Sequence, residues 1–332
     1  GDKFSTDAAT TFFHKFDFVN LNGAVRSLLG QREMNNIVKL DNGNLILPNT
    51  YVEDAVIAEN TDKITSFKNY LAYQGIPVIY VMTPNSLGLD ESVLPKGVDD
   101  YGNEYEDRFK KALTENGVFV LDIREEFKKD GLDHYDMMYK TDHHWTTKTG
   151  FYVYRKISDI VEKILECEVD PVVKDLNNYT ITTYEDWHLG SYGQRTGQIF
   201  GGIDDFDLIV PNFETSVTSG ENTGEFKHMI IYPDALAKKD VTSRYTYDNV
   251  LSGSTLNNFV NNNSHNDKKI LLFSDSMGKS VAPYFEISYA EVRNSEYPYT
   301  YEQIEEYKPD VVIIMYSPPN SQKSYYFDYV LP

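Results

Sequence analysis

The chain has 332 residues, 41% of them hydrophobic, and a formal net charge of −20. This length and apolar content suit one large α/β domain or two small ones with a real core, and they argue against a disordered chain. The acidic balance disfavours nucleic acid or an anionic membrane surface as a partner, because phosphate binding depends on clustered Lys and Arg and the sequence contains no such run. A neutral substrate suits this surface better.

The single cysteine, Cys167, excludes an intrachain disulfide and a multi-cysteine metal site, and we expect it to pack on a helix. No stretch approaches the roughly 18 consecutive apolar residues of a membrane span. The chain begins Gly-Asp-Lys without a signal-like pattern, so we expect an N-terminal signal or anchor to have been removed from it.

The first 60 residues are predicted to form a lead-in that packs on the main domain. Within it, residues 36–47 read as a β-hairpin, since Asn42-Gly43 favours a tight turn between alternating apolar positions. The next element is a helix over residues 61–75, with Thr61 as its N-cap and Gly75 as its stop.

Helices and strands then alternate. The expected helices cover residues 105–117, 146–166 and 301–309, and the expected strands cover residues 77–82, 118–123, 269–274 and 310–316. Solid apolar, β-branched strands are typical of a parallel sheet buried on both faces. The sequence therefore predicts a three-layer α/β domain over residues 61–332. A Tyr-, Thr- and Asn-rich stretch, at about residues 169–266, is expected to be a β-rich insertion.

Three residues from distant segments suit acyl transfer. Asp142 and His144 lie two apart, immediately before the helix whose N-cap candidates are Thr146 and Thr147, so the carboxylate could orient the imidazole through Nδ1. Ser276 follows the strand "KILLF", and sites in open parallel sheets form at the carboxyl ends of strands. The amides of Ser276 and Gly278 could hold a developing oxyanion.

These motifs resemble the DHHW family of bacterial proteins, related to the AlgX and AlgJ alginate O-acetylation proteins of the SGNH hydrolase superfamily. The resemblance is carried by "TDHHW" and the later "SDS", with support from "LLGQREMNNIVKLDNGNLI", "VMTPNSLGLDESVLP" and "YKPDVVIIM". It implies an extracytoplasmic SGNH-like (flavodoxin-like) domain in which Ser276 is the nucleophile, His144 the general base and Asp142 its orienting acid. The implied partners are a polysaccharide acceptor, an acetyl donor and a membrane-bound acetyltransferase, with no metal and no cofactor.

The sequence departs from the family pattern at three places. Ser274 stands in the first position of Gly-Asp-Ser, Ser86 replaces a lysine in the expected Pro-Asn-Lys, and "MYSPPNS" replaces a Glu-Arg pair after the last strand. The missing basic residues are compatible with an uncharged polymer or with weak activity. Further candidates for oxyanion or substrate binding are Asn85, Arg195, Tyr284 and Tyr316, and for each tyrosine, packing is an equal alternative.

Other functions remain open at this stage. Ser276 could be a helix cap, and His143 is expected at the surface or behind the site. A Ser-x-x-Lys motif ends at Lys279, but the Lys-Thr-Gly at residues 148–150 precedes it, which is the wrong order for a penicillin-binding enzyme. "DHH" also occurs in metal-dependent phosphoesterases, and a catalytically silent glycan-binding module would keep the same fold. Transferase and esterase cannot be separated by motif.

Overall fold

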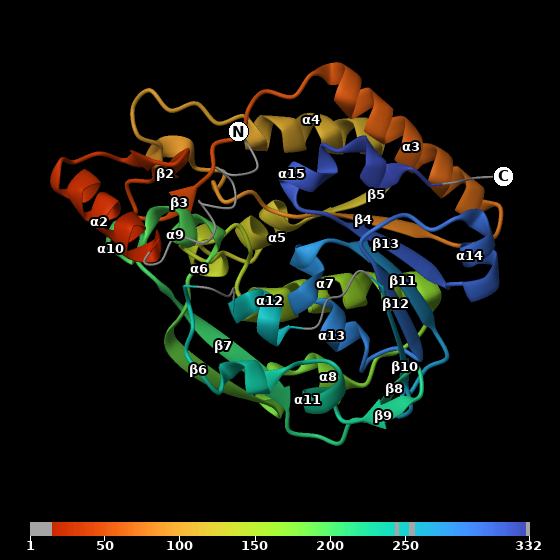
Figure 1. Ribbon diagram of the computed structural model, residues 1–332. Helices are drawn as coiled ribbons and strands as arrows, with labels where there is room; N and C mark the ends of the chain where they lie inside the picture. The colour runs from red at the N-terminus through yellow and green to blue at the C-terminus, as the bar shows by residue number, and fades with distance from the viewer. Residues whose placement is uncertain (1–14, 243–245, 252–255, 330–332) are drawn as a thin grey trace, which may run out of the picture.

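The computed structural model describes residues 15–242, 246–251 and 256–329 (Figure 1). Its first elements are α2 (Lys15–Leu28), β1 (Glu33–Met34), β2 (Ile37–Lys39), β3 (Leu45–Ile46), α3 (Asp54–Ala72), β4 (Val78–Met82), α4 (Gly102–Glu115), β5 (Phe119–Asp122), α5 (Ile123–Lys129), α6 (His134–Met137) and α7 (Thr147–Leu165). The next are α8 (Pro171–Lys174), β6 (Tyr179–His188), α9 (Ser191–Thr196), α10 (Gln198–Gly201), β7 (Asp204–Pro211), β8 (Val217–Ser219), β9 (Asn222–Gly224), α11 (Phe226–Met229) and α12 (Thr246–Val250). The last are β10 (Leu256–Asn261), β11 (Lys269–Ser274), α13 (Ala282–Phe285), β12 (Glu291–Ser295), α14 (Tyr301–Tyr307), β13 (Val311–Met315) and α15 (Pro318–Ser321).

The central sheet has eight strands in the order β5-β4-β13-β11-β12-β10-β8-β9. The first five are parallel to one another, and β10, β8 and β9 extend the sheet in antiparallel fashion. Read from β12, the parallel strands run β12-β11-β13-β4-β5, which is the flavodoxin order 2-1-3-4-5 if β11 is counted first. The first strand of this sheet along the chain, β4, therefore occupies the position of the fourth flavodoxin strand, as in a circular permutation.

Helices cover both faces of the sheet, as predicted (Figure 1). Side chains alternate across the pleat, so Ile270 and Leu272 join the core beneath α7 and α13, whereas Leu271 and Phe273 join the core beneath α3, α4 and α14. This two-sided burial explains why the central strands are continuously apolar. The three-layer α/β prediction is confirmed.

The helix predicted to begin at Thr61 starts earlier. α3 begins at Asp54, and Thr61 lies inside it, buried, so the expected boundary between residues 60 and 61 falls within a helix. The preceding residue, Asn60, is buried as well, and its side-chain amide donates to the carbonyl oxygen of Ser321 at 2.9 Å. Gly75 follows the helix with a φ of 76°, as a stop residue should.

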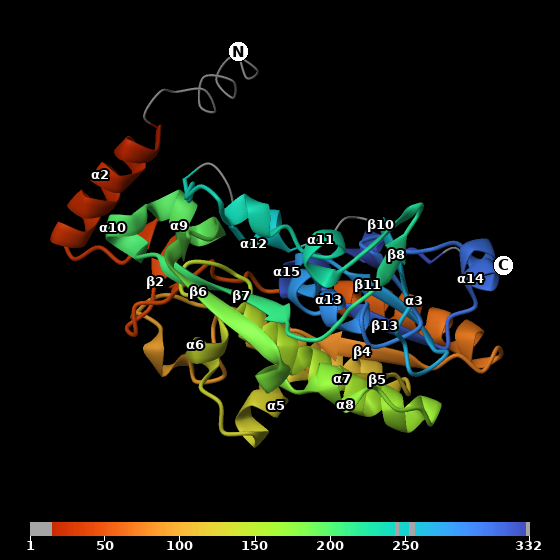
Figure 2. The ribbon, with the colours of Figure 1, turned by 90° about the horizontal axis from the view of Figure 1, so that it is seen from below.

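The predicted hairpin is present as β2 and β3, with Gly43 in the left-handed region at a φ of 89°. Together with β1 these strands form a small antiparallel sheet. Figure 2 shows this sheet at one end of the molecule, beside α2, α9 and α10. Its core contains Tyr192 and Phe200, so the N-terminal lead-in packs against the segment that was predicted to be an insertion.

The stretch at residues 169–266 contains both strands and short helices. β6 and β7 form a two-stranded ribbon, and β8, β9 and β10 join the central sheet. Helix α8 precedes these strands and α9 to α12 lie between them, so the stretch is less uniformly β than expected. No helix among the described residues is long and apolar enough to cross a membrane.

Candidate active site

Ser276 opens a 3₁₀ turn, Ser276–Ser280, directly after the carboxyl end of β11. Asp275 caps this turn, because its Oδ1 accepts the amide of Met277 at 3.0 Å. Its Oδ2 accepts the amide of Ser317 at 2.8 Å, the hydroxyl of Ser317 at 2.5 Å and the side-chain amide of Asn320 at 2.7 Å. The buried carboxylate therefore holds the serine turn against the segment that follows β13, a contact that no local motif predicted.

Gly278 does not have the role expected of it. Its amide donates to the carbonyl oxygen of Asp275 at 3.0 Å within the turn, so it is already used and cannot serve the oxyanion. A Cβ at this position would lie 2.1 Å from Oγ of Ser274, so the glycine is required for close packing of the turn on its own strand.

The Asp-His-His-Trp sequence lies between α6 and α7, and Thr146 caps α7 by accepting the amide of Thr149. Trp145 is fully buried, and its indole N–H donates to Oγ of Ser280 at 2.8 Å. The start of α7 also approaches the serine turn at Gly150, where a Cβ would come within 2.2 Å of Oγ of Ser280. These contacts fix the histidine loop to the serine turn.

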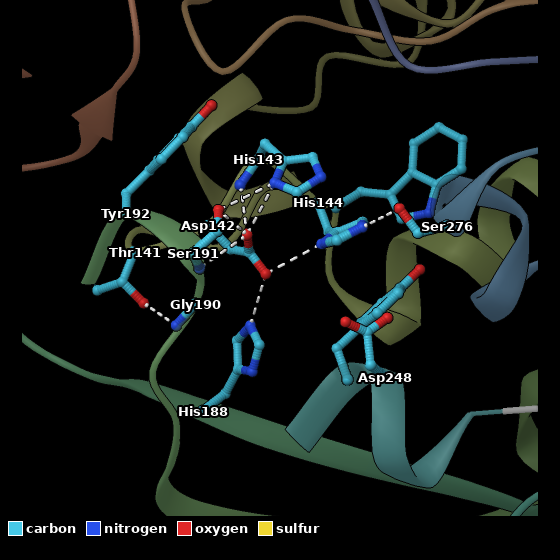
Figure 3. Close-up of polar contacts among 12 residues, drawn as sticks. Thr141, Asp142, His143, His144, His188, Gly190, Ser191, Tyr192, Asp248 and Ser276 are labelled. Atoms are coloured by element: carbon cyan, nitrogen blue, oxygen red, sulfur yellow. Dashed lines mark hydrogen bonds and ion pairs between the residues drawn. The ribbon is translucent and has the colours of Figure 1, made fainter. Parts of the chain in front are cut away.

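The structure brings the three predicted residues together (Figure 3). His144 Nδ1 lies 3.0 Å from Asp142 Oδ2, and His144 Nε2 lies 2.7 Å from Ser276 Oγ. The exposed fraction is 2% for Asp142 and 4% for His144. An imidazole held between a carboxylate and a hydroxyl in this way has the geometry that general-base activation of a serine requires.

Asp142 has further partners that the sequence did not predict. Its Oδ1 accepts the hydroxyl of Ser191 at 2.7 Å and the amide of Ser191 at 3.1 Å, and Oδ2 lies 3.1 Å from Nε2 of the fully buried His188 (Figure 3). Both residues come from the predicted insertion. A Cβ on Gly190 would lie only 2.2 Å from the Cβ of Asp142, so the backbone of residues 188–191 can approach Asp142 because residue 190 is a glycine. The glycine in the sequence did not by itself predict this contact.

The two imidazoles beside Asp142 differ in their electrostatics. Burial alone would raise the pKa of Asp142, but the rings of His144 and His143 outweigh it and hold that pKa well below its usual value. Burial opposes charge on His143 too, yet the Asp142 carboxylate raises the pKa of that ring. Burial and the neighbouring His143 lower the pKa of His144. His144 is therefore neutral and able to accept a proton at neutral pH.

Two aromatic rings contact His144. The centroid of the Tyr247 ring lies 4.3 Å from that of His144 and is stacked on it at an interplanar angle of 17°, and the centroid of the His143 ring lies 3.9 Å away with the ring tilted by 38°. Tyr247 comes from α12, and its hydroxyl donates to Ser280 Oγ at 2.9 Å. His143, expected at the surface or behind the site, lies beside the triad and is half-buried, with Nδ1 at 3.0 Å from both Asp142 Oδ1 and Ser191 Oγ.

Asn85 lies after β4 and is buried. Its Oδ1 accepts the side-chain amide of Asn49 at 3.4 Å, and its own Nδ2 has no hydrogen-bond partner among the described residues. Asn85 lines a cavity together with His143 and Ser317. A buried amide without an acceptor at such a place is a candidate donor to a bound substrate.

The structure places the other three predicted residues elsewhere. The Arg195 guanidinium donates to the carbonyl oxygen of Asn35 at 2.5 Å in the N-terminal sheet and does not line the cavity. Tyr284 packs among the aromatic rings of the core, and burial raises its pKa. The buried hydroxyl of Tyr316 donates to the carbonyl oxygen of Glu296 at 3.0 Å. In the structure, each of these three side chains is engaged in contacts outside the triad.

Potential metal ligands also meet here. Ligand atoms of Asp142, His143 and His144 all lie within 4.8 Å of one another. In this arrangement both nitrogens of His144 face other protein groups, Asp142 on one side and Ser276 on the other. A metal at this place would have to displace at least one of these contacts.

The chain resembles known proteins in sequence and in fold. The family model of the SGNH hydrolase-like domain of acetyltransferase AlgX matches residues 45–175. Bacillus cereus PatB1 superimposes with a TM-score of 0.72 at 21% identity, covering 88% of this chain and 99% of PatB1. A second PatB1 structure, with a sulfonyl adduct, gives the same TM-score at 19% identity, covering 90% of this chain and 99% of that one.

Two further structures are similar in fold. A DHHW family protein from Eubacterium siraeum has a TM-score of 0.66 at 16% identity, covering 90% of this chain and 97% of its own. The O-acetyltransferase domain of Pseudomonas putida AlgJ has a TM-score of 0.54 at 11% identity, covering 87% of this chain and 93% of its own. No curated protein sequence matches the chain. The chain therefore has an SGNH hydrolase-like fold, and its predicted resemblance to the DHHW, AlgJ and AlgX proteins is confirmed.

Proposed function

We propose that this protein is a serine-dependent O-acetyltransferase or acetylesterase that acts on a cell-surface or exported polysaccharide through an acetyl-enzyme on Ser276. The observation that carries the proposal is the position of His144, with Nδ1 at 3.0 Å from Asp142 and Nε2 at 2.7 Å from Ser276 Oγ. Hydrogen bonds to both nitrogens set the tautomer in which Nδ1 carries the proton and Nε2 is free to accept one.

In the first half-reaction, His144 Nε2 takes the proton of Ser276 Oγ while that oxygen attacks the acetyl carbonyl carbon of the donor. The tetrahedral intermediate collapses, the acyl–oxygen bond of the donor breaks, and the leaving oxygen receives the proton from His144. In the second half-reaction, a sugar hydroxyl or water gives its proton to His144 Nε2 and attacks the acetyl carbonyl carbon. The bond between that carbon and Ser276 Oγ then breaks, the acetylated sugar or acetate leaves, and Oγ takes the proton back from His144. Asp142 stabilises the imidazolium that forms twice in this cycle.

The developing oxyanion needs donors near Ser276. We assign this role to the Ser276 amide and to Nδ2 of Asn85, the buried donor that has no acceptor among the described residues. Gly278, whose amide is used inside the turn, is left out of this assignment.

The comparisons support acetyl transfer in three ways. The matching family description names an acetyltransferase, and the AlgJ structure is an O-acetyltransferase domain. PatB1 has been found with a sulfonyl adduct, and sulfonylating reagents attack activated hydroxyls. By the same likeness we propose an extracytoplasmic location, an acetyl donor and a membrane-bound acetyltransferase as partner.

The proposal is tested by release of acetate from p-nitrophenyl acetate, with intact-mass analysis of the protein. We expect turnover and a mass increase of one acetyl group, and we expect a sulfonyl fluoride to label the same site. Ser276→Ala should lose turnover and both labels, and His144→Ala should lose turnover. Ser66→Ala on the exposed side of α3 and His265→Ala at an exposed position are matched controls that should behave as wild type.

A wild-type protein with neither turnover nor adduct contradicts the proposal. Carbohydrate binding that persists in Ser276→Ala under those conditions would instead favour a catalytically silent glycan-binding module of the same fold.

A further inference from the structure

A cavity of about 570 Å³ opens beside the triad. One wall is the end of the N-terminal sheet with the segment that follows it, residues 46–50. The opposite walls are residues 84–87, after β4, and residues 317–319, after β13. The cavity thus lies over the carboxyl ends of two central strands, where open parallel sheets bind their ligands.

Two residues connect this cavity to the nucleophile. His143 lines it, and its ring lies 3.9 Å from that of His144. Ser317 also lines it and holds the carboxylate of Asp275, the residue before Ser276. Each of these two lining residues is therefore connected to Ser276 through one intervening residue, His144 in one case and Asp275 in the other.

The wall is polar but contains few charges. Several side chains can both donate and accept hydrogen bonds, as sugar hydroxyls require: Asn36, Asn49, Asn85, Ser86 and Gln322. Prolines and aliphatic side chains make up much of the remainder. Such a lining combines apolar contact with a few orienting polar groups, which is the usual composition of a small-molecule site.

No lysine or arginine lines the cavity among the described residues. Its acidic members are Glu33 and Asp100, and both oxygens of Asp100 already accept hydrogen bonds from Asn49 and Gly102. His143 is the one group there that can become a cation, and it is already paired with Asp142. A carboxylate or phosphate on a substrate would enter this cavity without a basic partner, which is unfavourable.

We propose that this cavity binds an uncharged sugar unit of the polysaccharide and excludes uronate or phosphorylated units. The inference rests on the proposed acetyl transfer at Ser276. We expect Asn49, Ser86 and Gln322 of the wall to bind the sugar oxygens, which leaves the buried Nδ2 of Asn85 for the oxyanion.

The test uses pairs of acetylated methyl glycosides that differ only in C6, a hydroxymethyl group in one and a carboxylate in the other. When the enzyme takes the acetyl group from such an ester, it runs the sugar-acetylation step in reverse and forms the same acetyl-enzyme on Ser276. For gluco, galacto and manno pairs, we expect kcat/KM of the neutral ester to exceed that of the uronate at least about tenfold in each pair that is turned over. An equal or inverted ratio overturns the proposal.

A charge variant probes the same cavity directly. Gln322→Lys adds a positive charge to the cavity wall. We expect it to lower the ratio of kcat/KM for the neutral ester to kcat/KM for the uronate ester by at least about threefold. Gln74→Lys adds the same charge beyond the end of α3, where Gln74 contacts Glu305, and should leave the ratio unchanged. A ratio that Gln322→Lys does not change, or that both variants change equally, contradicts the assignment of the cavity.

The outcome also separates this inference from the proposed function. If p-nitrophenyl acetate is hydrolysed in a Ser276-dependent way but no acetylated sugar of either kind is turned over, the cavity assignment fails and the catalytic serine stands. If p-nitrophenyl acetate is not hydrolysed and no acetyl adduct forms, the proposed function itself fails.

Discussion

His188 Nε2 lies 3.1 Å from Oδ2 of Asp142, the oxygen that also faces His144. His188 is completely buried, and its Nδ1 has no hydrogen-bond partner among the described residues. With Nδ1 unpaired, the ring is best placed to donate through Nε2, which orients the carboxylate toward His144. His188 is therefore a positioning residue for the proposed triad.

His188→Ala should lower kcat for p-nitrophenyl acetate by roughly 10- to 100-fold, the loss expected for one hydrogen bond to a charged group. KM should change little, since His188 does not reach the substrate. His188→Gln, which keeps an amide donor, should recover part of kcat, and the exposed His265→Ala serves as the control. If kcat falls equally in the Ala and Gln variants and the free energy of unfolding falls with it, His188 has a purely structural role.

The pH dependence of kcat/KM should follow His144. Because burial and His143 lower its pKa, we expect activity to rise with pH through an apparent pKa below the usual value of about 6.5 and to level off near neutrality. The sign follows from the mechanism, since protonated His144 cannot accept the Ser276 proton and activity is lost as pH falls.

Removing His143 should shift the acid side of that pH profile to higher pH. His143→Gln takes away the neighbouring imidazolium that disfavours charge on His144, so the apparent pKa on the acid side should rise. Rates measured from pH 4.5 to 8.5 with wild type, His143→Gln and His265→Gln give the comparison. A profile that shifts to lower pH in His143→Gln would contradict the assigned electrostatics.

The Asp275 carboxylate should be important for stability as well as activity. In Asp275→Asn, the side-chain NH₂ faces donors from Ser317 and Asn320 or gives up the cap on Met277, so at least one buried group loses its partner. We expect the free energy of unfolding to fall by about 1–3 kcal/mol, with a lower kcat because Ser276 begins the same turn. Urea unfolding measures this, with the exposed Asp267→Asn as the control; an unchanged midpoint would contradict the prediction.

A compensating pair tests the packing of the serine turn. Gly278→Ala places a Cβ 2.1 Å from Oγ and 2.7 Å from Cβ of Ser274, so we expect a loss of about 1–3 kcal/mol in unfolding free energy. Adding Ser274→Gly removes both atoms and should restore part of that stability. A double variant no more stable than Gly278→Ala alone would show that the clash is relieved in another way.

Chelation and elemental analysis test the alternative that this protein is a metal-dependent phosphoesterase. Since His144 faces Asp142 and Ser276 with its two nitrogens, we expect hydrolysis of p-nitrophenyl acetate to survive a chelator and elemental analysis to find metal well below one ion per chain. Stoichiometric zinc or manganese, together with loss of activity on its removal, would favour a metal-dependent phosphoesterase instead.

Much of the fold could be predicted because its signals are local. The central strands β4, β11 and β13 are buried on both faces, so each appears as a short unbroken apolar run. Helix boundaries were less certain: Thr61 resembles an N-cap, yet it is buried inside α3. The stretch at residues 169–266 showed no helical period because its described helices have only four to six residues each.

The sequence by itself singled out Asp142, His144 and Ser276 as the proposed triad, because a carboxylate two residues before an imidazole and a serine at a strand end each have a recognisable local setting. Only the tertiary structure decided their partners. It placed His188 and Ser191 on Asp142, tied Asp275 to Ser317, and committed Tyr284, Tyr316 and Arg195 to other contacts. Hydrogen bonds and packing act over a few ångströms in space but join residues far apart in the chain, so local pattern alone cannot assign them.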